Sequence, residues 1–92
     1  MAAPLVSVVI RSTARPTLGA ALACVAAQTY PAVEAVVVAA SGPSHPALPS
    51  HAGPHPVRLV TSGDALSRPA AANAGIDAAR GEWITFLDDD DA

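Results

Sequence analysis

Four short runs of apolar and β-branched residues recur along the chain, at positions 5–10, 33–40, 57–61 and 83–87. Runs of this length without strict polar alternation are typical of strands that are buried on both faces of a parallel sheet. The pattern therefore predicts four strands. Trp83, at the start of the last run, is expected to be a core residue.

The segment between the first two runs has helical periodicity. Pro16 suits a first helical turn, because its φ is preset and an N–H would have no intrahelical partner there. Four apolar residues then recur at helical spacing within 17–27, namely Leu18, Ala21, Leu22 and Val25. We predict an amphipathic helix here, with Cys24 as a small core residue.

A second helix is predicted at 69–79, because Pro69 can open it and apolar residues recur along it. Gly81 stands where a helix often ends on a glycine in the left-handed conformation. The expected apolar stripe of this helix consists of Ala72, Ile76 and Ala79.

The segment 41–56 holds five prolines and three histidines and shows no regular periodicity. We predict an irregular surface loop. The gaps of five and three residues between these histidines lie in a proline-rich segment with no cysteine partner, so exposed loop residues, rather than zinc ligands, are the favoured interpretation of His45, His51 and His55.

The predicted order is β-α-β-β-α-β, which favours an α/β, Rossmann-like fold with a mostly parallel four-stranded sheet and flanking helices. In such sheets ligands bind at the carboxyl ends of the strands. A chain of 92 residues forms one domain or part of one.

Charge and composition exclude several classes of protein. The net charge is −3 and the five cations are scattered arginines, so we expect no nucleic-acid partner. No apolar run approaches the ~20 residues of a membrane span. One cysteine excludes an internal disulfide and fits a cytoplasmic setting, with any contact to the inner membrane made through regions outside these residues.

Four of the eight acidic residues form one block, Asp88–Asp91, directly after the last predicted strand. A solvated tail is the simplest interpretation of such a block. Its position at the ligand-binding edge favours another one, because Asp-x-Asp can hold a hard divalent cation that also binds a diphosphate.

The ordered motifs resemble those of family 2 glycosyltransferases, which have the GT-A fold. The first strand and turn match as VSVVIRSTARP at 6–16, and QTYP at 28–31 and EAVVV at 34–38 follow in the same order. The most specific matches are AANAGI at 71–76 and ARGEWITFLDDD at 79–90.

The resemblance implies a metal-assisted transfer of a sugar from a nucleotide-diphosphate sugar to an unknown sugar, lipid or protein acceptor. It implies that Asp88 and Asp90 hold Mg²⁺ or Mn²⁺ and that Asp89 contacts the donor ribose. Ser12 is expected in the nucleotide pocket. Arg68 is expected at the diphosphate or base, with a solvated helix-start residue as the alternative.

Among the departures from the family pattern, one leaves the nucleotide base open. The family's D-D-G-S is replaced by Ala39-Ala40-Ser41-Gly42, which removes the acidic acceptor for the base. Arg11 replaces the usual proline of the first turn. Tyr30 and Trp83 carry rings that could stack on a base or sugar, and core packing is the favoured interpretation of Trp83.

The resemblance covers only the donor-binding half of that family. We therefore expect residues 1–92 to be the N-terminal, donor-binding part of an incomplete domain, without the acceptor half and with no catalytic base. The alternative is a truncated, non-catalytic fragment that binds the nucleotide sugar. A receiver-like binding module is disfavoured, because its acids would follow the first strand rather than the last.

Overall fold

A computed structural model describes residues 4–13, 18–42, 45, 47–61 and 65–88, without the side chain of Asp88. Two helices and five strands follow one another in these residues. Their order is β1 (Val6–Ser12), α1 (Leu18–Ala26), β2 (Val33–Ala39), β3 (His51–Ala52), β4 (His55–Val60), α2 (Arg68–Ala78) and β5 (Trp83–Asp88).

The strands form one sheet in the order β3-β4-β2-β1-β5. The pairs β1–β2, β1–β5 and β2–β4 are parallel, and only the short β3 runs antiparallel to its neighbour. The α/β, Rossmann-like architecture with a mostly parallel sheet is thereby confirmed.

The number of strands was predicted wrongly, because the sheet has five strands and not four. The additional strand, β3, lies in the segment predicted to be an irregular loop, and β4 begins at His55 rather than at residue 57. Gly53 has a φ of 58°, a left-handed conformation that glycine adopts without strain, and it lies in the turn between β3 and β4. This turn brings two otherwise irregular segments into register.

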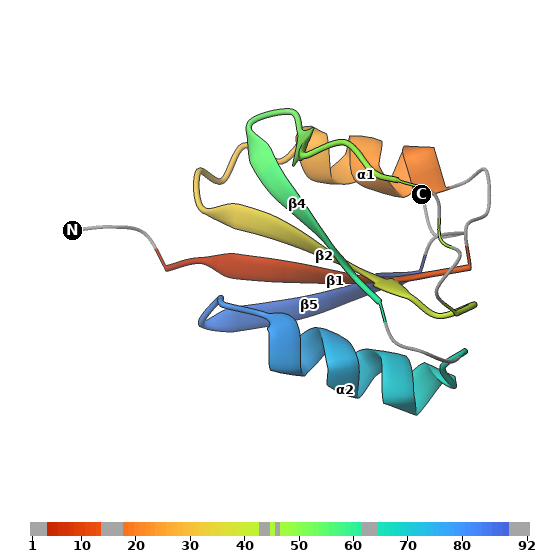
Figure 1. The fold of residues 1–92 in the computed structure, drawn as a ribbon. Coiled ribbons are helices and arrows are strands. Elements are labelled where there is room, and N and C mark those ends of the chain that lie inside the picture. The colour runs from red at the N-terminus through yellow and green to blue at the C-terminus, as the bar shows by residue number, and fades with distance from the viewer. Residues whose placement is uncertain (1–3, 14–17, 43–44, 46, 62–64, 89–92) are drawn as a thin grey trace.

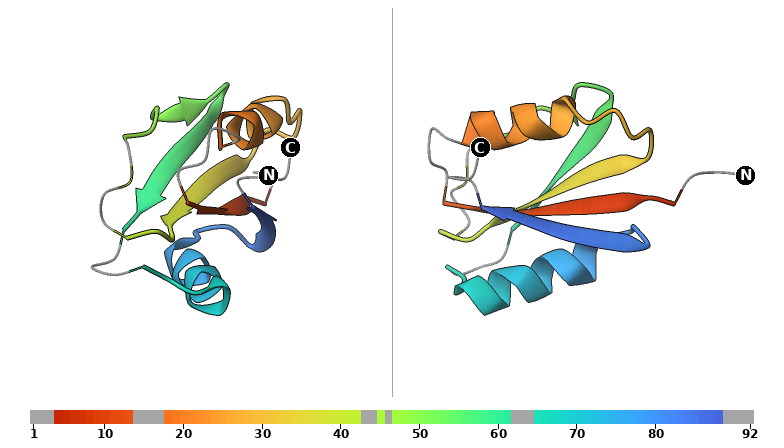
Figure 2. Two further views of the ribbon diagram at one scale, coloured as in Figure 1. Left: turned by 90° about the vertical axis from the view of Figure 1, so that its right-hand side faces the viewer. Right: turned by 180° about the vertical axis from the view of Figure 1, so that it is seen from behind.

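The helices cover opposite faces of the sheet, with α1 on one side and α2 on the other (Figures 1 and 2). Alternation along β1 supplies both cores, since successive side chains of a strand point to opposite faces. Val8 and Ile10 pack with Leu22 of α1, whereas Val9 packs with Ala71 of α2.

Helix α1 confirms the expected buried face of Leu18, Ala21, Leu22 and Val25. The prediction for Cys24 was wrong, because its side chain is exposed. It lines an open cavity between α1 and the sheet and is not part of the packed core. Pro16 and residue 17 are outside the described residues.

Helix α2 buries a different face from the one predicted. Ala71 and Gly75 are the buried residues, and Ile76 of the expected stripe is 45% exposed. A Cβ atom added at Gly75 would overlap the side chain of Val9. The small residues of α2 therefore set its close approach to β1, which a count of apolar residues does not reveal.

Gly81 does not end α2 as predicted. Ala79 in extended conformation is the C-cap, and its N–H donates to the carbonyls of Gly75 and Ile76. Gly81 instead lies against β1, where an added Cβ would come within 2.6 Å of the Leu5 carbonyl oxygen. The absence of a side chain at this position allows the connection between α2 and β5 to pack closely against the start of β1.

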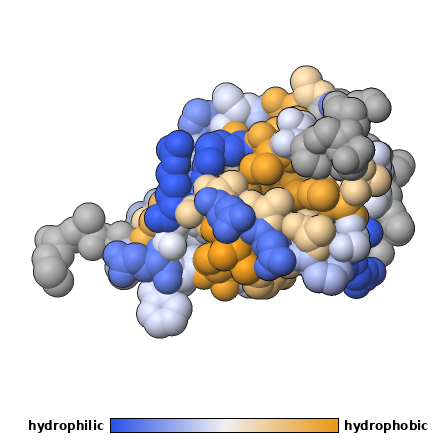
Figure 3. All heavy atoms as spheres, turned by 60° about the horizontal axis from the view of Figure 1, so that its bottom comes forward, coloured by the Kyte–Doolittle hydropathy of each residue, from blue (hydrophilic) through white to orange (hydrophobic). Residues whose placement is uncertain are grey.

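Strand β5 lies at one edge of the sheet, which explains why Trp83 is 66% exposed rather than part of the core. Phe86 on the same strand is 54% exposed. Figure 3 shows hydrophobic surface on the side of the molecule that carries α2. An edge strand packs against a neighbour on one side only, so an apolar sequence does not guarantee burial.

Candidate functional site

The carboxyl ends of β1, β2 and β5 and the start of α2 lie at the same edge of the sheet (Figure 1). The register pairs Ser12 of β1 with Ala39 of β2, and Arg11 of β1 with Asp88 of β5. The Leu66 N–H donates to the Ala40 carbonyl at 2.7 Å and holds the entry to α2 beside β2. Residues expected at the ligand-binding edge are thus brought together by three strands and one helix.

Asp88, the first member of the predicted Asp-x-Asp pair, is the last residue of β5, so the strand extends one residue further than predicted. Asp89 and Asp90 lie outside the described residues, so the metal pair and the ribose contact remain predictions. No cluster of three potential metal ligands occurs within the residues that the structure describes.

Ser12 is completely buried at this edge. Its Oγ lies 2.7 Å from Nε2 of His45, which comes from the segment between β2 and β3 and is half-buried. The sequence pattern indicated an exposed loop residue at His45 and contained no signal for this contact, because 33 residues separate the two side chains. A ligand at this edge therefore meets His45 more readily than Ser12.

Arg68 is the first residue of α2, after Ser67, whose side chain accepts a hydrogen bond from the Ala70 N–H. It lines a cavity of about 180 Å³ between α2 and the carboxyl-terminal parts of β1 and β5. Arg11 lines the same cavity, and its Nε is buried. The structure thus joins two cations that the sequence separates by 57 positions.

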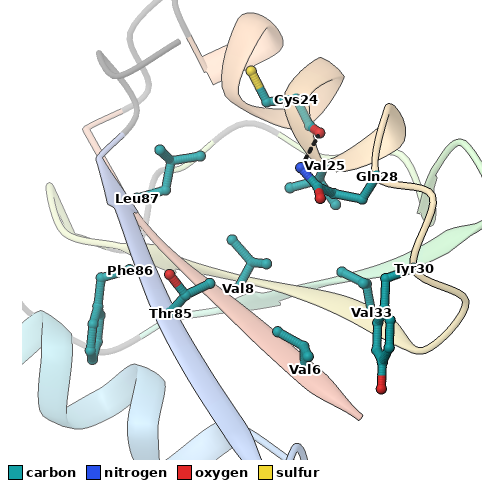
Figure 4. A pocket seen from close by; sticks show the side chains of 10 residues that line it. All are labelled: Val6, Val8, Cys24, Val25, Gln28, Tyr30, Val33, Thr85, Phe86 and Leu87. Atoms are coloured by element: carbon teal, nitrogen blue, oxygen red, sulfur yellow. Dashed lines mark hydrogen bonds between the residues drawn. The ribbon is translucent and has the colours of Figure 1, made fainter. Parts of the chain in front are cut away.

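A larger cavity, of about 350 Å³, lies between α1 and the strands β1 and β5. Figure 4 shows that Val8, Thr85 and Leu87 project toward it, whereas the ring of Phe86 points to the opposite side of β5. Its described lining contains no carboxylate, histidine or cation, and its polar groups come from Cys24, Gln28, Tyr30 and Thr85. This cavity is mainly apolar and lies apart from the charged residues of the carboxyl edge.

The two candidate stacking rings lie away from the ligand-binding edge. Tyr30 precedes β2, and its hydroxyl donates to the Pro4 carbonyl at 2.6 Å, before β1 begins. Trp83 is the first residue of β5, at the same amino-terminal edge of the sheet. Neither ring is placed to stack on a ligand at the carboxyl edge.

The amino-terminal edge is held by a buried carboxylate, Glu34, which the sequence pattern did not single out. Its Oε2 accepts hydrogen bonds from Ser7 Oγ at 2.6 Å and from the Arg80 N–H at 2.8 Å. Its Oε1 accepts from Arg58 Nη2 at 2.9 Å. Burial alone would raise the pKa of Glu34, but these hydrogen bonds and the charge of Arg58 outweigh it and lower that pKa.

The comparison with protein families agrees with this architecture. The model of the family "Glycosyl transferase family 2" matches residues 7–92. The chain belongs to that family. A search of curated proteins and a search of solved structures found no significant match.

Family 2 glycosyltransferases act on a nucleotide-sugar donor and an acceptor, and a divalent metal is common among them. The match spans β1 to β5 and thus every element that forms the carboxyl edge. Within the described parts of the chain, neither α1 nor α2 has the length and hydropathy that a membrane-spanning helix requires.

Proposed function

We propose that residues 1–92 are the donor-binding part of a metal-dependent family 2 glycosyltransferase. The donor is a nucleotide-diphosphate sugar that binds at the carboxyl edge of the sheet. The observation that carries this proposal is the register of β5 with β1, which sets Asp88 beside Arg11 in a chain of this family. The acceptor is a sugar, a lipid or a protein.

The carboxylates at the end of β5 and directly after it suit a hard divalent cation. Asp88 and Asp90 provide carboxylate oxygens, which Mg²⁺ and Mn²⁺ prefer together with phosphate oxygens. Asp88 stands at the end of a strand whose neighbour, β1, ends at the same edge. A bound cation would stabilise the negative charge that develops on the departing diphosphate.

Other residues of this edge orient the donor. Arg68 donates hydrogen bonds to the diphosphate from the cavity at the start of α2. Asp89 contacts the ribose. Ser12 is buried, so it serves the nucleotide pocket by holding the ring of His45, 2.7 Å from its Oγ. With Ala39 and Ala40 at the end of β2, the base is recognised without a carboxylate from that strand.

Calorimetric titration of the chain with nucleoside diphosphates and nucleotide sugars, with and without Mn²⁺, tests the proposal. Binding is expected to require the metal and to be weakened by Asp88→Asn and by Asp90→Asn. Asp77→Asn is the matched control, because Asp77 is an exposed carboxylate on α2. The proposal is wrong if the heat signal stays flat for every donor in the presence of Mn²⁺.

A further inference from the structure

Arg11 contributes to a cavity that has the features of an anion-binding site. Arg11 is the last but one residue of β1, and Arg68 reaches the same cavity, of about 180 Å³, from the first position of α2. Val9, Ala71 and Phe86 supply apolar walls. Guanidinium groups donate pairs of parallel N–H bonds that match phosphate oxygens, and apolar walls strengthen such contacts by excluding water.

The Nε atom of Arg11 is buried and lacks a hydrogen-bond acceptor among the described residues. A buried donor without an acceptor destabilises a fold, and natural proteins keep few of them. Arg58 shows the contrast, because its guanidinium donates both to Glu34 and to the Ala78 carbonyl.

The position of Arg11 connects this cavity with the proposed donor site. Arg11 is in register with Asp88, so the cavity lies beside the end of the strand that carries the acidic block. The motif that the chain resembles has a proline at position 11, which has no side-chain donor. The cation is therefore a feature of this chain and not of the family pattern.

We infer that Arg11 and Arg68 together form a subsite for the diphosphate group of the donor, in which Arg11 Nε donates to a phosphate oxygen. The identity of the ligand rests on the proposed function. Binding of a diphosphate anion by the cavity does not, because it follows from the two guanidinium groups and the unsatisfied Nε.

The test measures the affinity of the chain for inorganic pyrophosphate, a nucleoside diphosphate and the corresponding nucleoside. Arg11→Gln is expected to weaken binding of pyrophosphate and of the nucleoside diphosphate about 10- to 100-fold, as for the loss of one charge-assisted hydrogen bond, and to leave nucleoside binding unchanged. Arg80→Gln removes the same charge from an exposed residue in the connection between α2 and β5 and is the matched control.

Stability measurements separate a binding role from a structural one. Arg11→Gln replaces a buried, charged guanidinium that has an unsatisfied Nε by a neutral amide that can turn its oxygen or its NH₂ group to that position, so its unfolding midpoint is expected to equal or exceed that of the wild type. Arg11→Lys keeps the charge without the paired donors and is expected to retain intermediate affinity. If Arg11 served only as an ion-pair partner of Asp88, Arg11→Gln would lower the midpoint and leave pyrophosphate affinity unchanged.

The outcomes distinguish this inference from the proposed function. Equal pyrophosphate affinity of the wild type and Arg11→Gln, or no pyrophosphate binding by the wild type, overturns the subsite. Binding of pyrophosphate that depends on Arg11, without binding of any nucleotide sugar, supports the subsite and overturns the proposed donor.

Discussion

Glu34 offers the sharpest test of how this sheet is held together, because one carboxylate connects three parts of the chain. It receives hydrogen bonds from Ser7 of β1, from Arg58 of β4 and from the backbone of Arg80 in the connection between α2 and β5. Ser7 Oγ in turn accepts from the Gly81 N–H at 2.8 Å. Glu34→Gln keeps the shape of this side chain and removes its charge.

The expected cost follows from the two carboxylate oxygens. Both oxygens accept hydrogen bonds, whereas a glutamine amide keeps only one acceptor and turns an NH₂ group toward donors on the other side. The variant loses one charge-assisted hydrogen bond and gains one unsatisfied buried donor, which together cost about 2–4 kcal/mol of stability. A domain of this length is stable by about 5–14 kcal/mol, so the variant loses a large part of its stability.

The pH dependence has a definite sign. The pKa of Glu34 is lower in the folded chain than its ordinary value of about 4.5, so the unfolded chain binds the proton more strongly. The stabilisation from the ionised carboxylate is therefore complete above that ordinary value and is lost as the pH falls through the folded pKa. The stability difference between the wild type and Glu34→Gln is expected to shrink over the same range.

Urea unfolding followed by far-ultraviolet circular dichroism, from neutral pH down through the acid range, measures both effects. The single tryptophan is a poor probe, because Trp83 is already 66% exposed in the folded chain. Glu82→Gln changes an exposed glutamate and is expected to shift stability by no more than about 0.5 kcal/mol. Equal unfolding curves for Glu34→Gln and the wild type at neutral pH would show that the Glu34 carboxylate does not stabilise the sheet.

Three further predictions concern close contacts and exposure. Gly81→Ala is expected to lower the free energy of unfolding in urea by about 1–3 kcal/mol, because the added Cβ atom would contact the backbone of residues at the start of β1. Gly19→Ala is the control, because open space surrounds Gly19, and it is expected to stabilise α1 by up to about 1 kcal/mol. Equal effects of the two substitutions would contradict this prediction. Gly75→Ala is expected to destabilise the fold, because its Cβ atom would overlap the side chain of Val9. The double variant with Val9→Ala is expected to lose less free energy of unfolding than the sum of the two single variants. Strictly additive losses would contradict the contact. Cys24 is expected to react with a thiol reagent in the folded state, and labelling only after denaturation would show that it is buried.

The elements themselves were largely readable from local pattern. The runs that became β1 and β2 are apolar along nearly their whole length, as expected for central strands covered on both faces. The four apolar residues of α1 recur at helical spacing and are all buried. The boundaries were less accurate where the chain turns tightly, since Gly53 closes a hairpin inside a segment that otherwise reads as irregular.

The candidate site was readable only in outline. The rule that ligands bind at carboxyl strand ends placed Ser12 and Asp88 at one edge, and the register bears this placement out. The same rule said nothing of His45 against Ser12, or of Arg11 beside Arg68. These pairs are far apart in the sequence, and no periodicity links them.

Local sequence pattern was sufficient to identify the two helices, the four longer strands and their order, and the motifs were sufficient to indicate the family, because periodicity and motifs are local properties. Packing of the whole chain, in contrast, determines that Trp83 and Phe86 lie on an exposed edge strand. It also decided that Glu34 is buried among three elements. The burial of a side chain and its hydrogen-bond partners depend on which strands become neighbours. The neighbours are set by packing of the whole chain rather than by any one segment.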